Sequence, residues 1–202
     1  MADAPADRAR AYLPDADGWV QAARRVPSPN FDARPDGMPV DVVVLHNISL
    51  PPGQFGTGDI EAFFQNRLDA TRHPFFETIR GVRVSAHFLV TREGELVQFV
   101  GCTHRAWHAG QSDYRGRQRC NDFSIGIEIE GTDDQPFTLA QYDTVATLVN
   151  ALRAAYPIQG IAGHSDIAPG RKTDPGPHFD WDRFASLAGL PAGLLPYLPK
   201  TR

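Results

Sequence analysis

Two histidines and one aspartate, far apart in the chain, combine the residue types of a metal site. His46 ends an apolar run, His164 lies in the segment AGHS, and Asp174 lies in the proline-framed segment RKTDPGP. Two imidazoles and one carboxylate leave the fourth position of a tetrahedral zinc ion open for water, which is typical of a catalytic site. A lone histidine at a strand end is more often structural, so the prediction depends on all three together. The set predicts a metal-dependent hydrolase.

The segment SIGIEIEG at 124–131 can supply a proton acceptor. Its isoleucines alternate with small or acidic residues, so an extended strand places Glu128 and Glu130 on one face. Amide hydrolysis needs a group that takes a proton from water and passes it to the leaving amine, typically worth roughly 10²–10⁴-fold in rate. Glu128 is the candidate base and Glu130 its rival, because spacing does not separate them. Lys172 lies two residues before Asp174, so in an extended segment its ammonium faces the same way and can stabilise an oxyanion.

The order of the predicted elements indicates the fold class. Strands and helices follow one another in a way that predicts an α/β fold, a single domain with a central mixed β-sheet flanked by α-helices. The segment 103–121 has neither helical nor strand periodicity, so we expect long irregular loops to line the zinc site. The expected elements are a strand at 41–46, a helix capped by Asp59, a hairpin of 84–90 and 96–100, a strand at 124–130, an amphipathic helix from the capping box Thr138–Gln141 to about 155, and a helix from Asp180 to Gly189.

Length and composition favour one catalytic domain. With 202 residues and 42% hydrophobic content, one domain is the default, and we assign it to residues 18–190. A loosely structured extension at 1–17 precedes it, and a proline-rich tail at 191–202 follows. The net charge of -4 gives no reason to expect nucleic-acid binding, and no apolar stretch suits an export signal or a membrane span. Cys102 and Cys120 are interpreted as free thiols of a cytoplasmic protein.

Many distinctive segments follow one another along the chain: ARRVPSP (23–29), LHNISLPPG (45–53), RVSAH (83–87), RAWHAG (105–110), CNDFSIGIE (120–128), GHSDIAP (163–169) and KTDPGP (172–177). With these segments the chain resembles the zinc-dependent N-acetylmuramoyl-L-alanine amidases, specifically the cytosolic AmpD type, over almost everything from about residue 18 to 184. The resemblance implies a mixed sheet of the kind shared with phage amidases and peptidoglycan recognition proteins.

The resemblance implies one zinc ion per chain, with ligands His46, His164 and Asp174 and catalytic residues Glu128 and Lys172. It therefore favours the first of the two glutamates as the base. The implied substrate is a 1,6-anhydro-N-acetylmuramyl peptide, cut between the lactyl group and L-alanine in cytoplasmic peptidoglycan recycling, with an indirect negative effect on β-lactamase induction. This small glycopeptide is the partner we expect; no nucleic acid, membrane or obligate protein partner is expected.

The resemblance also suggests side chains that bind the substrate. Arg83 and Arg119 are proposed anchors for stem-peptide carboxylates, because a guanidinium fork matches a carboxylate. Asn47 and Trp107 are weaker candidates for peptide and sugar contacts. Two alternatives stay open. A lytic amidase would use the same chemistry on the intact wall, and a non-enzymatic muropeptide receptor would use the same fold without a complete ligand set.

Overall fold

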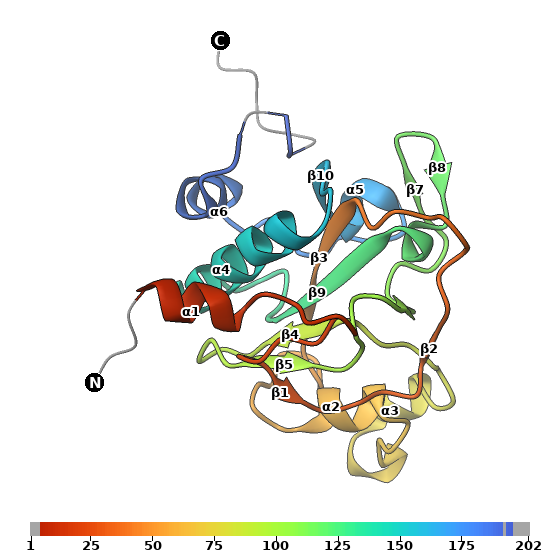
Figure 1. The fold of residues 1–202 in the computed structure, drawn as a ribbon. Helices are drawn as coiled ribbons and strands as arrows, with labels where there is room; N and C mark the ends of the chain where they lie inside the picture. The colour runs from red at the N-terminus through yellow and green to blue at the C-terminus, as the bar shows by residue number, and fades with distance from the viewer. Residues whose placement is uncertain (1–4, 192, 196–202) are drawn as a thin grey trace.

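A six-stranded mixed sheet forms the centre of the computed structural model, which describes residues 5–191 and 193–195 (Figure 1). Its strand order is β1-β5-β4-β9-β3-β10, and only the β4–β5 pair is antiparallel among the neighbours. The predicted α/β class with a mixed sheet is confirmed. The strands are β1 (Arg24–Arg25), β5 (Leu96–Gln98), β4 (Phe88–Val90), β9 (Ser124–Glu130), β3 (Val42–Ile48) and β10 (Gly160–Gly163).

The two longest strands, β3 and β9, alternate their side chains between the two faces of the sheet. Their odd-numbered apolar residues, including Leu45 and Ile127, belong to the largest core cluster. The even-numbered residues point to the other face, where β9 carries Glu128 beside His46 of β3 in a parallel register. The alternation predicted for 124–131 is therefore confirmed. On β3 the even-numbered face also buries Val42 and Val44, and its polar chemistry begins at His46.

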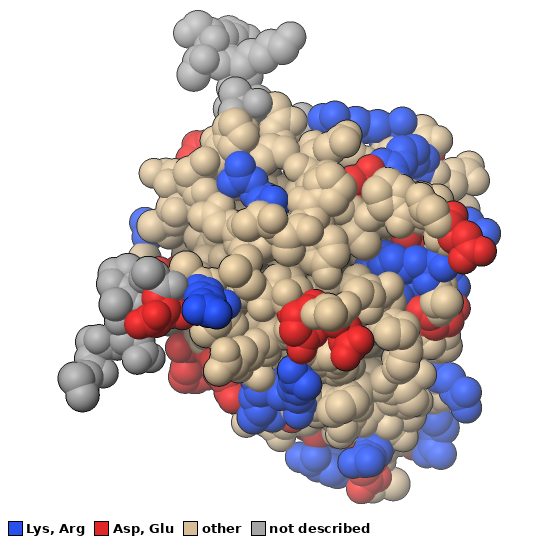
Figure 2. Space-filling model, viewed as in Figure 1, with Lys and Arg blue, Asp and Glu red and all other residues tan. Residues whose placement is uncertain are grey.

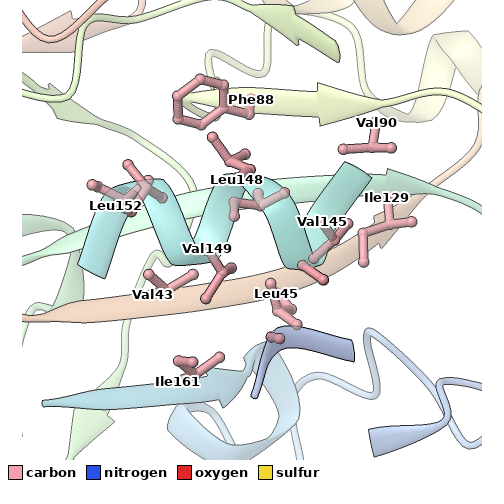
Figure 3. Close-up of a cluster of buried hydrophobic side chains, with 14 of the residues drawn as sticks. Val43, Leu45, Phe88, Val90, Ile129, Val145, Leu148, Val149, Leu152 and Ile161 are labelled. Carbon is pink, nitrogen blue, oxygen red and sulfur yellow. The ribbon is translucent and has the colours of Figure 1, made fainter. Parts of the chain in front are cut away.

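Helix α4 (Leu139–Ala155) covers the apolar face of the sheet. Thr138 and Gln141 form the predicted capping box, which satisfies amide groups at the helix start. Figure 3 shows the side chains of α4 packed over those of the strands, and fully burying one such aliphatic side chain contributes roughly 1.5–3 kcal/mol. Helix α6 (Trp181–Ala188) packs beside α4 and runs, as predicted, from the cap Asp180 to Gly189, whose φ is 55°. This layer is a stable support for the opposite face.

Short helices cover the sheet near β4 and β5. These are α2 (Asp59–Phe64), η1 (Ala70–Arg72) and α3 (Pro74–Thr78), which bury Phe64 and Phe76 in a second core cluster. The predicted cap at Asp59 is wrong: the N-cap is Gly58, in a left-handed conformation, and Asp59 pairs instead with Arg72. Asp59 is the first residue of the helix, and its buried carboxylate has the guanidinium of Arg72 as the charged partner that a buried charge needs.

The loop predicted to be irregular, 103–121, contains short elements. Strand β6 (Arg105–Ala106) pairs with β2 (Phe31–Asp32), and β7 (Asp113–Tyr114) pairs with β8 (Arg117–Gln118) before the turn η2 (Cys120–Asp122). Two-residue strands have no recognisable period, so sequence reasoning missed them. Together they hold the segment against the polar face of the sheet.

Part of each terminal segment is folded. Residues 5–17, predicted to be loose, include helix α1 (Pro5–Ala11), whose Arg8 pairs with Asp143 of α4 at 2.5 Å, and Tyr12 is buried. Near the other end, the backbone oxygen of Leu194 accepts a hydrogen bond from Ile161 of β10. The predictions for 1–4, 192 and 196–202 lie outside the described residues. Where the chain is described, no helix has the length and apolarity of a membrane span.

Charges of both signs are interspersed on the face of the molecule in Figure 2. Many of them form ion pairs: Arg24, for example, contacts Glu61 and Glu95, both at 2.7 Å. Such exposed pairs typically contribute only about 0–1 kcal/mol each.

Candidate metal centre

Three side chains converge at the carboxyl end of the central strands. His46 lies near the end of β3, His164 begins the short helix α5 (His164–Ile167) directly after β10, and Asp174 lies in the following loop. The Nδ1 atoms of the two histidines are 3.0 Å apart, and each lies 3.0 Å from Oδ2 of Asp174. Ligands of a tetrahedral zinc with bonds of about 2.0 Å are separated by roughly 3.3 Å. The spacing therefore suits one small cation.

The electrostatics of the cluster favour the protonation states that bind a metal. Burial lowers the pKa of His46 to about 4, against the opposing influence of Asp174, so the imidazole is neutral near pH 7. Burial opposes ionisation of Asp174, but the close imidazoles of His164 and His46, each 3.0 Å from Oδ2, hold the pKa of Asp174 well below its usual range. The neutral imidazole of His46 and the carboxylate of Asp174 are thus in the protonation states in which such groups bind zinc.

Glu128 lies beside this cluster because β3 and β9 are paired in register. His46 and Glu128 are direct neighbours across the two parallel strands. Glu128 is 8% exposed, and among the described residues its Oε2 has no hydrogen-bond partner. Burial raises the pKa of Glu128 well above its ordinary value, and the charge of Asp174 raises it further. A buried, unpartnered carboxyl group with a raised pKa is suited to accept and release a proton.

Glu130, the rival on the same strand face, is fully engaged. Its Oε1 accepts a hydrogen bond from the backbone N–H of Gly56 at 2.7 Å, and its Oε2 accepts one from the N–H of Arg92 at 3.0 Å. Both oxygens therefore tie loops to the sheet. The tertiary structure thus distinguishes two glutamates that the sequence places on the same face.

An open cavity of about 680 Å³ adjoins the cluster, and Asp174, Lys172 and Asn47 are among its lining residues. Lys172 is exposed there. Asn47, predicted to contact substrate, already uses its amide: Nδ2 donates to Asp133 at 2.7 Å and to the backbone oxygen of Pro175 at 3.0 Å. Asn47 therefore links β3 to Asp133 and to the loop that carries Asp174, and only its side-chain oxygen remains to accept a hydrogen bond.

The other predicted substrate residues are more dispersed. Arg119 is exposed, pairs with Asp122 at 3.2 Å, and lines a second cavity of about 410 Å³. Arg171 lines both this cavity and the one beside Asp174, so the two are neighbours. Arg83 lines a separate cavity of about 230 Å³ near α2 and α3. Trp107 is half-buried, and its backbone N–H donates to Ser85. The structure thus clusters the ligands with Glu128, Lys172 and Asn47 more tightly than with the arginines and the tryptophan.

Two residues beside the metal cluster were not assigned to it from the sequence. Nδ1 of His108 lies 2.9 Å from Nε2 of His46, on the side away from the metal cluster. Arg171 donates to the backbone oxygens of Ala109 and Gln111, which holds the loop of 103–121 over the site. The segment RAWHAG pointed to this loop, but its sequence contains no sign of the partner that His108 contacts.

The fold and these residues define a class of protein: an α/β protein whose two histidines and one aspartate could hold a metal ion, a donor set of the kind that metal-dependent hydrolases use. The family profile described as N-acetylmuramoyl-L-alanine amidase matches residues 36–177. The chain belongs to this family. It is 56% identical over 180 residues to the 1,6-anhydro-N-acetylmuramyl-L-alanine amidase AmpD of Salmonella typhimurium, which covers 88% of this chain and 96% of the relative. AmpD of Escherichia coli is 56% identical over 172 residues, covering 84% and 94%.

Solved structures agree with this assignment. A crystal structure of a selenomethionine derivative of AmpD, 56% identical, superposes with a TM-score of 0.84 over 87% of this chain and 98% of that chain. The amidase AmiD of Escherichia coli is 32% identical with a TM-score of 0.55, over 78% of this chain and 60% of that chain. That AmiD structure is a complex with the substrate anhydro-N-acetylmuramic acid-L-Ala-D-γ-Glu-L-Lys.

Proposed function

We propose that this protein hydrolyses the amide bond between the lactyl group of 1,6-anhydro-N-acetylmuramic acid and the L-alanine of the stem peptide. One zinc ion per chain would be held by Nδ1 of His46, Nδ1 of His164 and Oδ2 of Asp174. The observation that carries the proposal is the convergence of these three atoms, at 3.0 Å from one another, beside the unpartnered carboxyl group of Glu128. The names of the AmpD relatives and the AmiD complex supply the substrate class.

In this mechanism the protein moves one proton and stabilises one charge. Zinc, when bound, lowers the pKa of water to roughly 7 and polarises a carbonyl group. Glu128 takes the proton of the attacking water at its carboxylate and delivers it to the nitrogen of L-alanine as the amide bond breaks. Lys172, in the cavity that Asp174 also lines, places its ammonium where the carbonyl oxygen becomes negative; losing one such donor typically costs about 3–4 kcal/mol in the barrier.

We assign the substrate contacts by chemistry and position. The exposed guanidinium of Arg119 can bind a carboxylate of the stem peptide, since its cavity adjoins the metal cluster through Arg171. Arg83, in a more distant cavity, would contact a longer peptide, and Trp107 would offer an apolar face to the sugar. Asn47 contributes only its side-chain oxygen. We place this reaction in the cytoplasm, in peptidoglycan recycling, where removal of muropeptides would lower β-lactamase induction.

Product analysis tests the proposal. The zinc-loaded protein is incubated with 1,6-anhydro-N-acetylmuramyl tripeptide and with intact sacculi, and products are identified by mass spectrometry. We expect 1,6-anhydro-N-acetylmuramic acid and free tripeptide from the first substrate, loss of both with a chelator, and their return with added zinc. Undiminished cleavage by fully demetallated protein would refute the zinc mechanism. Release of peptides from sacculi with no action on the soluble muropeptide would refute the recycling role.

A further inference from the structure

We propose that His108 is a positioning residue that holds His46 in the tautomer with its proton on Nε2, so that Nδ1 presents a lone pair to the metal. Nδ1 of His108 lies 2.9 Å from Nε2 of His46, and both rings are buried. The inference rests on the proposed metal site, because tautomer matters only if Nδ1 is the ligand atom. A neutral imidazole binds a metal through the nitrogen that carries no proton.

Hydrogen bonds connect His46 to His108, His108 to Ser124, and Ser124 to the backbone oxygen of Cys120. The positions of the protons follow from the Cys120 end of this series. The hydroxyl of Ser124 lies 2.6 Å from the backbone oxygen of Cys120, and a carbonyl has no proton, so the hydroxyl must donate. Ser124 Oγ also lies 3.1 Å from Nε2 of His108. Its single proton is already used, so Oγ accepts there and Nε2 of His108 must donate.

The second nitrogen of His108 is then an acceptor. The ring is buried, and neither of its nitrogens contacts a carboxylate among the described residues, so a charged imidazolium would be unpaired and costly. With its proton on Nε2, neutral His108 has a lone pair on Nδ1. Nε2 of His46 must therefore donate, which leaves Nδ1 of His46 unprotonated and directed at the cluster.

Close packing fixes the ring in this position. A Cβ atom added to Gly126 of β9 would lie 2.4 Å from Cγ of His108, so only glycine lets the imidazole rest against the strand. The side-chain oxygen of Asn121 accepts hydrogen bonds from the backbone N–H groups of His108, at 3.1 Å, and Ala109, at 2.8 Å. The ring thus has little freedom to turn away from His46.

The same loop serves the other histidine ligand. Nε2 of His164 lies 3.1 Å from the backbone oxygen of Ala109, the residue next to His108. A carbonyl only accepts, so Nε2 of His164 donates and its Nδ1 faces the cluster. Two consecutive residues of one loop therefore set the tautomers of both ligands, and we expect the loop to tune metal affinity without touching the metal.

Zinc affinity of two shape-matched variants tests the role of His108. In His108→Asn the side-chain oxygen can occupy the place of Nδ1 and accept from His46, whereas His108→Leu has the same branched shape and no acceptor. Competition with a fluorescent chelator should show a zinc Kd raised about 10–100-fold in His108→Leu, the usual effect of losing such a partner, and substantially restored in His108→Asn. Equal affinities of the two variants would overturn the proposal.

A spectroscopic measurement keeps the test independent of variant folding. In the zinc-loaded wild-type protein, long-range ¹H–¹⁵N spectra should show His108 protonated on Nε2 and bare at Nδ1. Protonation of His108 on Nδ1 would overturn the proposal. If His108→Leu does not fold, Ser124→Ala replaces it, and we expect a raised Kd because His108 then loses its fixed donor direction; an unchanged Kd would count against the proposal. Wild-type protein that binds no zinc would instead refute the proposed metal site.

Discussion

Glu128 and Glu130 lie two residues apart on one face of β9, and we predict that the same substitution in each changes a different property. Glu128→Gln should abolish most activity without lowering stability, because the carboxyl group has no partner at Oε2 and burial opposes its ionisation. Glu130→Gln should lower stability, because both carboxylate oxygens accept backbone hydrogen bonds. Both variants exchange one carboxylate oxygen for an NH₂ group. They therefore separate the effect on proton transfer from the effect on stability.

The size of the stability effect follows from the hydrogen bonds of Glu130. A glutamine amide has one oxygen, so either the N–H of Gly56 or that of Arg92 then faces an NH₂ group. A hydrogen bond to a charged group contributes roughly 1.5–3 kcal/mol, and a buried donor left unpaired costs about 1–3 kcal/mol. We therefore expect Glu130→Gln to lower the free energy of unfolding by about 3 kcal/mol. For a chain of this size that corresponds to a Tm lower by roughly 6–12 °C.

The activity effect follows from the proposed role of Glu128. Glutamine fills the same volume but does not take a proton, so turnover of anhydro-muropeptide should fall by roughly 10²–10⁴-fold. Zinc content should stay that of the wild type, since Glu128 is not among the three converging ligand atoms. The free energy of unfolding should not fall, because no hydrogen bond at Oε2 is lost and glutamine removes a carboxyl group whose ionisation is opposed by burial.

Urea unfolding, zinc content and steady-state turnover are measured on both variants and the wild type. At temperatures well below its Tm, Glu130→Gln should keep substantial activity. That result would show that the folded fraction of this variant has an intact site. An active Glu128→Gln enzyme would refute the assignment of the base. A Glu130→Gln protein as stable as the wild type, but inactive, would reverse the roles of the two residues.

Three further predictions concern buried groups around the site. His164→Ala should lose zinc and activity while keeping its far-UV circular dichroism; elemental analysis that finds one zinc per chain would refute the ligand assignment. Gly126→Ala should destabilise the protein by about 1–3 kcal/mol and weaken zinc binding, because the added Cβ would meet the ring of His108. A wild-type free energy of unfolding together with a wild-type zinc Kd, from denaturation and chelator titrations, would contradict this. Burial and the Arg34 cation lower the pKa of His87 from 6.5 to about 3. Between these two pH values the unfolded state binds a proton at His87 that the folded state does not bind, so the free energy of unfolding falls as the pH drops. Below pH 6, His87→Asn should therefore show a smaller slope of unfolding free energy against pH than the wild type, by up to about 1.4 kcal/mol per unit; equal slopes would contradict this.

Local patterns were sufficient to predict the main elements and the residue types of the site. The β-branched run before His46 and the alternation in SIGIEIEG predicted β3 and β9, and Thr138 with Gln141 predicted the start of α4. These predictions succeed because burial on one or both faces imposes a period that the sequence must show. They fail at Asp59, where a distant arginine takes the side chain, and in the two-residue strands of the loop 103–121.

The sequence by itself determined the class of fold, the residue types that could bind zinc, and the strand face that carries both glutamates. Only the tertiary structure decided that Glu130 accepts hydrogen bonds from two loops and that the Asn47 amide donates to Asp133 and Pro175. It also decided that His108 contacts Nε2 of His46. Periodicity reports which face of its own element a side chain occupies. It does not report which atom of another segment lies 3 Å away, and the histidine ligands that meet here are 118 residues apart. Those contacts are set by the packing of the whole sheet and its loops.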